Sequence, residues 1–391
     1  MSSPSDSIAP SIESSVYQRY AAASNTVEAA LCCPVSYAGN YLSNIPQEII
    51  DKDYGCGDPS PYVNAGETVL DLGSGGGKLC YILAQVVGER GKIIGVDCNP
   101  EMLALARKYQ SEMVERLGYA NVDFRYGMIQ DLKLNLDLLG KRLDDAPIRS
   151  PQDWVQSRFA EEELREQSPL VQSGSVDCVV SNCVLNLVRQ QDRRQLFDEV
   201  FRVLKPGGRA AISDIVADED VPLHMQRDGH LWSGCLSGAF REDRFLQAFR
   251  DAGFHGVHIA KRQSEPWQTI EGIEFRSVTV LAYKAAGGEE FDLNQAAMYK
   301  GPFSDIRDDF GHIFKRGEWT AVGDKTFQLL SRPPYADCFE LMSPVEPVSQ
   351  LLAKPFADAT RPRTPREVKG ETYRVSFESG SSCCGDDGSC C

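Results

Sequence analysis

The chain has 391 residues, which is too long for one ordinary hydrophobic core, so we expect a main domain and at least one smaller domain. Its 42% hydrophobic and 25% charged residues are typical of a folded globular protein, and its net charge of -15 excludes a general nucleic-acid binder, which needs a basic face for phosphates. No apolar run approaches the roughly 18 residues of a membrane span, and no secretory signal is visible. We therefore expect a cytoplasmic protein without membrane or nucleic-acid partners.

The first 60 residues show little regular pattern. Residues 1–15 are rich in Ser and Pro, and we expect them to be disordered. Residues 16–60 contain a few short helical patterns and three cysteines, namely Cys32, Cys33 and Cys56. We treat this stretch as a separate N-terminal segment that precedes the regular fold.

From Glu67 onward, short apolar runs alternate with amphipathic segments. The apolar runs predict strands, and the segments with a 3.6-residue period predict helices. This alternation is typical of an α/β fold, a parallel sheet with helices on both faces, which we place at residues 61–286. The expected strands are residues 69–72, 92–97, 122–126, 176–181, 209–215, 257–260 and 277–283, and the expected helices are residues 79–87, 101–117, 192–204 and 243–252.

The remaining stretches interrupt or follow this alternation. Residues 132–172 are charged, contain three prolines and predict a surface insertion with one helix near residues 157–166. The Ala-Ala-Gly-Gly run at 285–288 predicts a linker to a small α+β domain at residues 289–345. A Pro-rich stretch then opens a flexible tail, residues 355–391, which ends in SSCCGDDGSCC.

A glycine-rich turn, Asp71-Leu-Gly-Ser-Gly-Gly-Gly77, follows the first expected strand. Such a turn lets a ligand approach the backbone at the carboxyl ends of parallel strands. The dinucleotide fingerprint GxGxxG would need a glycine where Lys78 stands, so the shorter GxGxG spacing fits better. A glycine-rich turn without a cofactor, or a nicotinamide dehydrogenase, is the alternative interpretation. We assign four residues of the turn to a cofactor site: Asp71, Gly73, Gly75 and Gly77.

Further elements of this site follow in order along the chain. A carboxylate ends the second strand, where it would bind ribose hydroxyls, and a KPGG turn lies at residues 205–208. Together with the GxGxG turn, this order resembles class I methyltransferases, which implies a Rossmann-like sheet, S-adenosylmethionine as co-substrate and an adenine site after the third strand. We assign six more residues to the cofactor site: Asp97, Met128, Ile129, Tyr54, Asn99 and Asn182.

Thirteen cysteines are unusual for a chain without a secretory signal, because cytosolic thiols stay reduced. Their spacing matches no zinc module, since no CxxC occurs. By default most are small buried hydrophobic residues, and we interpret Cys80 and Cys98 in this way. Three others lie in distinct motifs: Cys56 in YGCG, Cys183 in SNCVLNL just past the fourth strand, and Cys235 in WSGCLSGA.

These three motifs, in this order around DLGSGxG, resemble the arsenite S-adenosylmethionine methyltransferase family over residues 32–342. The resemblance implies that Cys183 and Cys235 bind trivalent arsenic, with Cys56 as a further sulfur. It also implies that Cys56 and an N-terminal cysteine serve later thiol and disulfide steps; the match falls on Cys32 or Cys33, and we favour Cys32. The implied substrates are arsenite and methylarsenite as thiol complexes, with glutathione or thioredoxin as reductant, and we expect a monomer.

The chemistry of arsenic agrees with this resemblance. Trivalent arsenic is a soft centre, for which thiolates are natural ligands. Three sulfurs leave arsenic a lone pair that can attack a methyl group in line, so no general base is needed, and catalysis is mostly positioning. Methylation formally oxidises arsenic, and a nearby thiol pair can reduce it again while forming a disulfide.

Three departures from the family pattern stand out: the long insertion, Gly234 where Glu is often seen, and Asp53 where a second Tyr is common. Gly234 bears on the geometry of the arsenic site and on substrate preference. Two other functions stay open at this point, a methyltransferase for a small organic acceptor and a thiol-rich protein that sequesters metalloids. The terminal CCGDDGSCC fits either a metalloid collector or a tail with exposed thiols.

Overall fold

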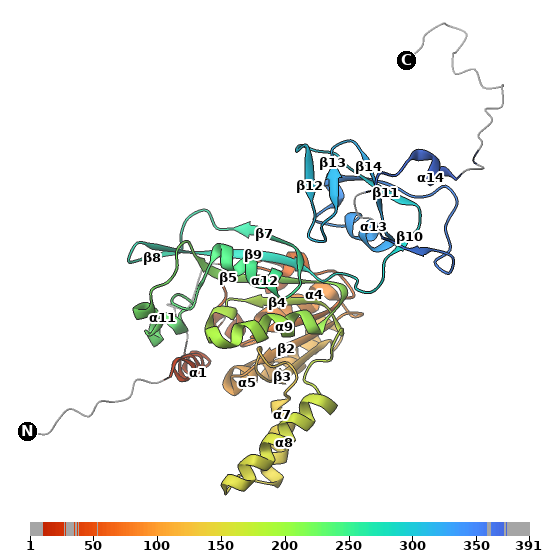
Figure 1. Cartoon of the computed structure of the whole chain (residues 1–391). Coiled ribbons are helices and arrows are strands. Elements are labelled where there is room, and N and C mark those ends of the chain that lie inside the picture. Colours follow the sequence, from red (N-terminus) through yellow and green to blue (C-terminus); the bar gives the residue numbers. More distant parts are fainter. Residues whose placement is uncertain are drawn as a thin grey trace, which may run out of the picture. The chain divides into compact units, whose positions relative to one another are not determined.

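The chain divides between Ala285 and Ala286 into two compact units (Figure 1). The structure, a computed structural model, describes residues 11–26, 28, 35, 37, 39–52, 54–357, 361–370 and 373. The predictions for Cys32, Cys33, Asp53 and the terminal cysteines therefore lie outside the described residues.

A nine-stranded mixed sheet forms the centre of the first unit, with its main strands in the order β3-β2-β1-β4-β5-β9-β7. The strands β3, β2, β1, β4 and β5 run parallel, as expected, whereas β9 is antiparallel to β5 and to β7. This antiparallel edge differs from the all-parallel sheet that we expected. Residues 263–272 suffice to connect β7 to β9, because antiparallel neighbours require no crossover helix. The strands are β1 Thr68–Leu72, β2 Lys92–Asp97, β3 Val122–Tyr126, β4 Val176–Asn182, β5 Leu204–Ala217, β6 Phe240–Arg241, β7 His255–Arg262, β8 Gln268–Ile270 and β9 Ile273–Tyr283.

Helices precede, connect and cover these strands. The helices are α1 Ile12–Ala23, α2 Gly39–Leu42, α3 Gln47–Asp51, η2 Ser60–Tyr62, α4 Lys78–Val87, α5 Pro100–Lys108, α6 Gln110–Leu117, α7 Leu136–Asp145, α8 Pro151–Gln167, η3 Leu185–Leu187, η4 Gln190–Asp192, α9 Arg193–Val203, α10 Leu223–Gln226, α11 Gly229–Ser233 and α12 Glu242–Asp251. In β1, Leu70 packs with α9 and α12, whereas its neighbour Val69 packs with α4, α5 and α6. Because successive side chains of a strand point to opposite faces, helices cover both faces of the sheet, as expected (Figure 1).

Several element boundaries differ from the sequence prediction. The expected helix at residues 101–117 is two helices, because Tyr109 leaves the helical conformation at φ -98° and ψ 3°. The insertion holds two helices, α7 and α8, instead of one. Helix α1 begins at Ile12, within the stretch expected to be disordered, because the Ser11 side chain accepts a capping hydrogen bond from the backbone N–H of Ser14 at 3.2 Å.

The second unit has a small α+β core of its own. A three-stranded antiparallel sheet in the order β14-β11-β15 packs with α13, and two strand pairs, β10-β16 and β12-β13, complete it. Its elements are β10 Phe291–Asp292, β11 Gln295–Tyr299, β12 Asp305–Arg307, β13 Ile313–Lys315, β14 Trp319–Val322, α13 Asp324–Leu330, η5 Ala336–Cys338, β15 Phe339–Met342, β16 Lys354–Pro355 and α14 Pro365–Lys369.

The folded part of this unit continues into the expected tail. Arg363 is buried, and its guanidinium forms an ion pair with Asp292 at 2.5 Å. Val368 on α14 is also buried. Placing the start of a flexible tail at residue 355 was therefore wrong, because an ion pair and an apolar anchor hold residues 361–370 in place. Within the described residues, no helix combines the length and apolarity needed to cross a membrane.

Candidate active site

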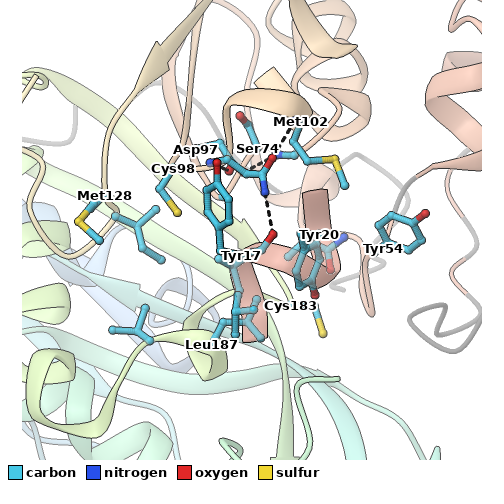
Figure 2. Close-up of a pocket in the computed structure, with 18 of the residues that line it drawn as sticks. Tyr17, Tyr20, Tyr54, Ser74, Asp97, Cys98, Met102, Met128, Cys183 and Leu187 are labelled. Atoms are coloured by element: carbon cyan, nitrogen blue, oxygen red, sulfur yellow. Dashed lines mark hydrogen bonds between the residues drawn. The ribbon is translucent and has the colours of Figure 1, made fainter. Parts of the chain in front are cut away.

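A cavity of about 680 Å³ lies at the carboxyl ends of β1, β2 and β4 (Figure 2). This volume is within the range of roughly 300–1,000 Å³ that is usual for small-molecule sites. Nine of the ten residues predicted to bind the cofactor line it: Tyr54, Asp71, Gly73, Gly75, Asp97, Asn99, Met128, Ile129 and Asn182.

The glycine-rich turn forms one wall of this cavity. Gly73 and Gly75 have positive φ angles of 70° and 50°, a conformation that L side chains rarely adopt. A Cβ on Gly75 would meet no atom within 4 Å, so the backbone of the turn stays accessible. Gly77 is not among the lining residues: it is the N-cap residue of α4 with φ 89°, and a Cβ there would lie 2.9 Å from the Phe124 ring. Gly77 therefore shapes the turn, in contrast to its predicted place in the cofactor site.

The Asp97 carboxylate lies at the edge of the cavity next to this turn. Its oxygens accept hydrogen bonds from the backbone N–H groups of Gly75 and Asn99, each at 2.8 Å. Burial raises the pKa of Asp97, and the backbone hydrogen bonds oppose that rise. Nearby, the Ser74 hydroxyl is buried without a hydrogen-bond partner among the described residues, so the cavity offers a polar atom that a ligand can satisfy.

Helix α1 supplies another part of the cavity wall that the sequence did not reveal. Tyr17 and Tyr20 point from α1 into the cavity, on the side where Cys183 also lies (Figure 2). The Asn99 side chain donates to the carbonyl oxygen of Tyr17 at 3.3 Å, and the Tyr54 hydroxyl donates to that of Ala23 at 2.9 Å. These hydrogen bonds fix α1 against the cofactor side of the site.

The three cysteines of the motifs converge in one buried apolar cluster. The sulfurs of Cys56 and Cys183 and a carboxylate oxygen of Asp214 all lie within 4.8 Å of one another. The Cys235 thiol donates a hydrogen bond to the carbonyl oxygen of Cys183 at 3.1 Å. Cys183 also lines the cavity, so the thiol cluster and the cavity meet at this residue.

Cys183 and Cys235 both adopt left-handed backbone conformations, with φ angles of 65° and 60°. For a residue with a Cβ this conformation costs roughly 1–2 kcal/mol. Strained backbone of this kind is concentrated at functional sites, where the surrounding structure enforces it. The two strained positions are therefore independent support for a functional thiol cluster.

The YGCG motif is held against the end of β4 by the Asn182 side chain. The Asn182 carbonyl oxygen accepts hydrogen bonds from the backbone N–H groups of Cys56 and Gly57, at 2.8 and 3.0 Å, and its amide donates to the Gly57 carbonyl oxygen at 2.7 Å. A Cβ on Gly55 would lie 2.3 Å from the Asn182 amide, and a Cβ on Gly57 would lie 2.6 Å from the Cβ of Ser213. The close approach explains why Cys56 stands between two glycines.

Asp214 and Arg193 hold the turn that carries Cys183, and sequence reasoning missed both. The Asp214 carboxylate accepts hydrogen bonds from the backbone N–H groups of Leu185, Asn186 and Ile215. Burial raises its pKa to about 7. The signal for Asp214 is a lone carboxylate within the apolar strand AAISDIVA, whereas no sequence pattern distinguishes Arg193.

Arg193 is buried and joins the two cysteine motifs. It donates to the carbonyl oxygens of Val188 and Asn186, which follow Cys183, and to that of Gly238, which follows Cys235. Burial lowers its pKa to about 10.

The thiols of Cys183 and Cys235 have pKa values well above the ordinary value. For Cys183, a hydrogen bond from Cys235 lowers the pKa, but the hydrogen bond to Cys56 and burial together outweigh it. For Cys235, the hydrogen bond to Cys183 and burial raise the pKa, and the charge of Asp214 adds to the effect. Both groups are therefore protonated thiols near neutral pH before any substrate binds.

The other described cysteines separate into buried and exposed groups. Cys80 is buried as expected, and its thiol donates to the Asp71 carboxylate at 3.2 Å. Cys98 is exposed and lines the cavity, so its interpretation as a buried hydrophobic residue was wrong. It follows Asp97 at the end of β2, where the strand no longer covers its side chain.

Comparisons with known proteins agree with this geometry. A family model described as a methyltransferase domain matches residues 63–144 and 155–253, and one described as a domain of unknown function matches residues 286–373. The arsenite methyltransferase of Aquipseudomonas alcaligenes is 31% identical over 335 residues, covering 82% of this chain and 86% of that protein. The arsenite methyltransferase of Mus musculus is 30% identical over 322 residues, covering 80% of this chain and 76% of that protein.

A solved structure shows the same relationship. The crystal structure of an arsenic(III) S-adenosylmethionine methyltransferase from Chlamydomonas reinhardtii is similar with a TM-score of 0.52 and 26% identity, covering 83% of this chain and all of that one. These matches confirm the class I methyltransferase fold and the use of S-adenosylmethionine as co-substrate. The chain therefore belongs to the arsenite methyltransferase family.

Proposed function

We propose that this protein transfers methyl groups from S-adenosylmethionine to trivalent arsenic held by Cys56, Cys183 and Cys235. The observation that carries the proposal is the convergence of three buried thiols beside a cavity that fits a cofactor. Two carboxylates, Asp71 and Asp97, line that cavity and suit a cationic ligand. The accessible turn around Gly75 leaves room for this ligand. The Ser74 hydroxyl, which has no partner in the described part of the chain, offers it a polar contact.

Arsenic binding needs no external base in this site. The thiols of Cys183 and Cys235 are protonated, and arsenite carries three hydroxyl groups. Each thiol forms an arsenic–sulfur bond while its proton leaves with one hydroxyl as water, so three thiols release three waters. Soft sulfur ligands then replace hard oxygen ligands on a soft centre, which favours the product. Methylarsenite has one fewer hydroxyl, so two thiols suffice for it.

The chain's own residues place the arsenic for methyl transfer. S-adenosylmethionine supplies an electrophilic methyl group, and the arsenic lone pair attacks it. Because Cys183 belongs both to the thiol cluster and to the cavity wall, it holds arsenic at the boundary between the two. Tyr17 and Tyr20 line the same cavity (Figure 2). Because the reaction needs no general base, positioning provides most of the rate enhancement.

Methyl transfer raises arsenic from the trivalent to the pentavalent state, and the electrons must be returned. Two cysteine sulfurs that form a disulfide give two electrons back to arsenic, which leaves a methylated trivalent product. Cys56, together with Cys32, is our candidate for this pair, and glutathione or thioredoxin would reduce the disulfide again. Such a cycle requires reduced thiols, and the described cysteines are free. We therefore propose a monomeric enzyme in the cytoplasm, where thiols stay reduced.

Speciation of arsenic after incubation with arsenite or methylarsenite, S-adenosylmethionine and glutathione tests this function. Cys183→Ser and Cys235→Ser are expected to abolish turnover of both substrates, because a serine oxygen is a hard donor that cannot replace sulfur. Cys56→Ser and Cys32→Ser should lose activity on arsenite and keep activity on methylarsenite. Cys338→Ser, at an exposed cysteine in the second unit, is the matched control and should behave like the wild type. Activity of Cys183→Ser on methylarsenite would refute the proposed site.

A further inference from the structure

Two peptide turns carry sulfurs that we propose as arsenic ligands, and the backbones of these turns lie against each other. The Cys183 turn is residues 183–188, and the Cys235 turn is residues 235–239. A Cβ on Gly238 would lie 2.2 Å from the carbonyl oxygen of Asn186, so a glycine is needed where the two backbones meet. The separation of the two sulfurs therefore depends on how these turns pack together.

The Arg193 side chain lies at this contact and bonds to both turns. Its Nη2 donates to the carbonyl oxygen of Asn186 at 3.3 Å and to that of Gly238 at 2.6 Å, so a single nitrogen bridges the two turns. Its Nε donates to the carbonyl oxygen of Val188 at 3.1 Å. The guanidinium also lies over the Phe240 ring, 4.2 Å from the ring centroid. Arg193 is thus held in one orientation by contacts on several sides.

The charge of Arg193 is buried at a cost in free energy. Its hydrogen bonds within the described residues all end on backbone carbonyl oxygens and none on a carboxylate. The charge of Asp214 offsets the burial only in part, because the pKa of Arg193 still falls to about 10. Apolar side chains in place of buried charged groups are often equally stable. Stability alone is therefore a poor reason for this cation, whereas its planar fork of donors fixes the relative position of three carbonyl groups.

We propose that Arg193 is a positioning residue of the arsenic site, which sets the separation of the Cys183 and Cys235 sulfurs by fixing one turn to the other. The inference rests on the proposed function, because it takes both sulfurs as arsenic ligands. Two sulfurs bind one arsenic atom only at a suitable separation, and a misplacement of about 1 Å can cost about 100-fold in activity. Arg193 does not line the cofactor cavity, so its removal should affect arsenic and not the cofactor.

The test compares Arg193→Met, which removes the donors, with Arg193→Lys, which keeps the positive charge but lacks the planar fork. Methylarsenite is the probe, because under the proposed function it needs only the sulfurs of Cys183 and Cys235. Its binding is followed by tryptophan fluorescence, since the buried Trp232 stands three residues before Cys235. Arg193→Met should raise the dissociation constant for methylarsenite about 10- to 100-fold, and Arg193→Lys should raise it less. The affinity for S-adenosylmethionine, measured by calorimetry, should stay unchanged in both.

Gly238→Ala disturbs the same contact and leaves the Arg193 side chain in place. The new Cβ would overlap the Asn186 carbonyl oxygen, so the two turns must move apart. This variant should also bind methylarsenite more weakly and S-adenosylmethionine normally. Because both substitutions act on one contact, their effects on methylarsenite binding should combine less than additively in the double variant. Should Arg193→Met fail to fold, Arg193→Lys and Gly238→Ala carry the same comparison of the two ligands.

Arg202→Met is the matched control, because Arg202 lies at the opposite end of α9 and donates to the carbonyl oxygen of Val171 at 3.1 Å. It should lower the melting temperature without changing the affinity for methylarsenite. Unchanged methylarsenite affinity in the Arg193 and Gly238 variants, or equal weakening of methylarsenite and S-adenosylmethionine, would overturn the positioning role. Cys235→Ser separates the two proposals: wild-type methylarsenite affinity in that variant refutes the thiol site itself, whatever the Arg193 variants show.

Discussion

Replacing Asn182 by Ala removes the side chain that fixes the Cys56 turn to the sheet. Three backbone hydrogen bonds disappear: those from the N–H groups of Cys56 and Gly57 and the one to the Gly57 carbonyl oxygen. A buried backbone group left without a partner costs about 1–3 kcal/mol, and Asn182 is partly exposed, so water compensates in part. Because water compensates for part of the three lost bonds, we expect a loss of about 2–6 kcal/mol in the free energy of unfolding, the range for two such groups.

The functional effect should depend on the substrate. A freed Cys56 turn no longer presents its sulfur to Cys183, so turnover of arsenite should fall by about 10-fold or more beyond any fall for methylarsenite. Urea unfolding gives the stability, and arsenic speciation gives the two rates. The matched control is Asn121→Ala, because the Asn121 amide likewise donates to backbone carbonyl oxygens, those of Ala84 and Gly88, at 3.0 Å. It should lose stability and keep the ratio of the two rates.

A double-mutant cycle sharpens this prediction. An alanine Cβ at Gly55 would lie 2.3 Å from the Asn182 amide, so Gly55→Ala alone should be strongly destabilising. In the Asn182→Ala background that clash is absent, and the second substitution should cost much less. Simple additivity of the two losses would show that Asn182 does not hold the turn by the contact described.

Three further predictions concern the cofactor side, the buried carboxylate and the tail. Asp97→Ala should weaken S-adenosylmethionine binding by about 1.5–3 kcal/mol, the value of charge-assisted hydrogen bonds, and unchanged affinity by calorimetry would place the ribose elsewhere. The pKa of Asp214 is raised to about 7, so the folded protein loses stability as the pH rises from about 4 to about 7. In urea unfolding, the free energy of unfolding of Asp214→Asn should rise by about 2–3 kcal/mol relative to that of the wild type between pH 5 and pH 8. If the unfolding free energies of the two proteins changed in parallel with pH, the raised pKa of Asp214 would be refuted. Removal of residues 361–391 should lower the melting temperature more than removal of residues 374–391, because only the longer deletion removes the buried Arg363 and Val368; equal melting temperatures would contradict this.

The predictable part of the fold is the part with local periodicity. The strand at residues 92–97 and the turn after Asp71 follow from apolar runs and glycine spacing, and the structure has both. Tyr109, where the expected long helix breaks, shows no such signal, because the break is a change of backbone angles at a residue with ordinary helix propensity. The direction of β9 also cannot be predicted from its own sequence, since the side chains of parallel and antiparallel strands alternate between the two faces in the same way.

The sequence predicted those residues of the candidate site that lie in recognisable motifs. Cys56, Cys183 and Cys235 stand in glycine-flanked or strand-end motifs, and the structure brings them together. Tyr20 contributes through the packing of α1, a tertiary effect that no spacing of residues encodes. Asp214 stands within an apolar strand, which indicates a buried carboxylate with a specific role. The sequence does not show which backbone N–H groups bind it, because they come from the folded chain.

The left-handed residues of the chain set a limit on how it can be made more stable. Among the described residues with a side chain, four have clearly positive φ angles: Cys183, Cys235, Glu271 and Asn294. Glu271 precedes Gly272 in the exposed hairpin turn between β8 and β9, where Asn-Gly is the favoured pair. Glu271→Asn therefore offers a gain of a few tenths to about 1 kcal/mol, less the small contribution of the exposed ion pair with His224. Glycine at 183 or 235 would relax the backbone in the same way and remove the sulfur. Directed evolution for heat resistance alone would therefore drift toward a sturdier protein that no longer handles arsenic, unless each round also selects for turnover.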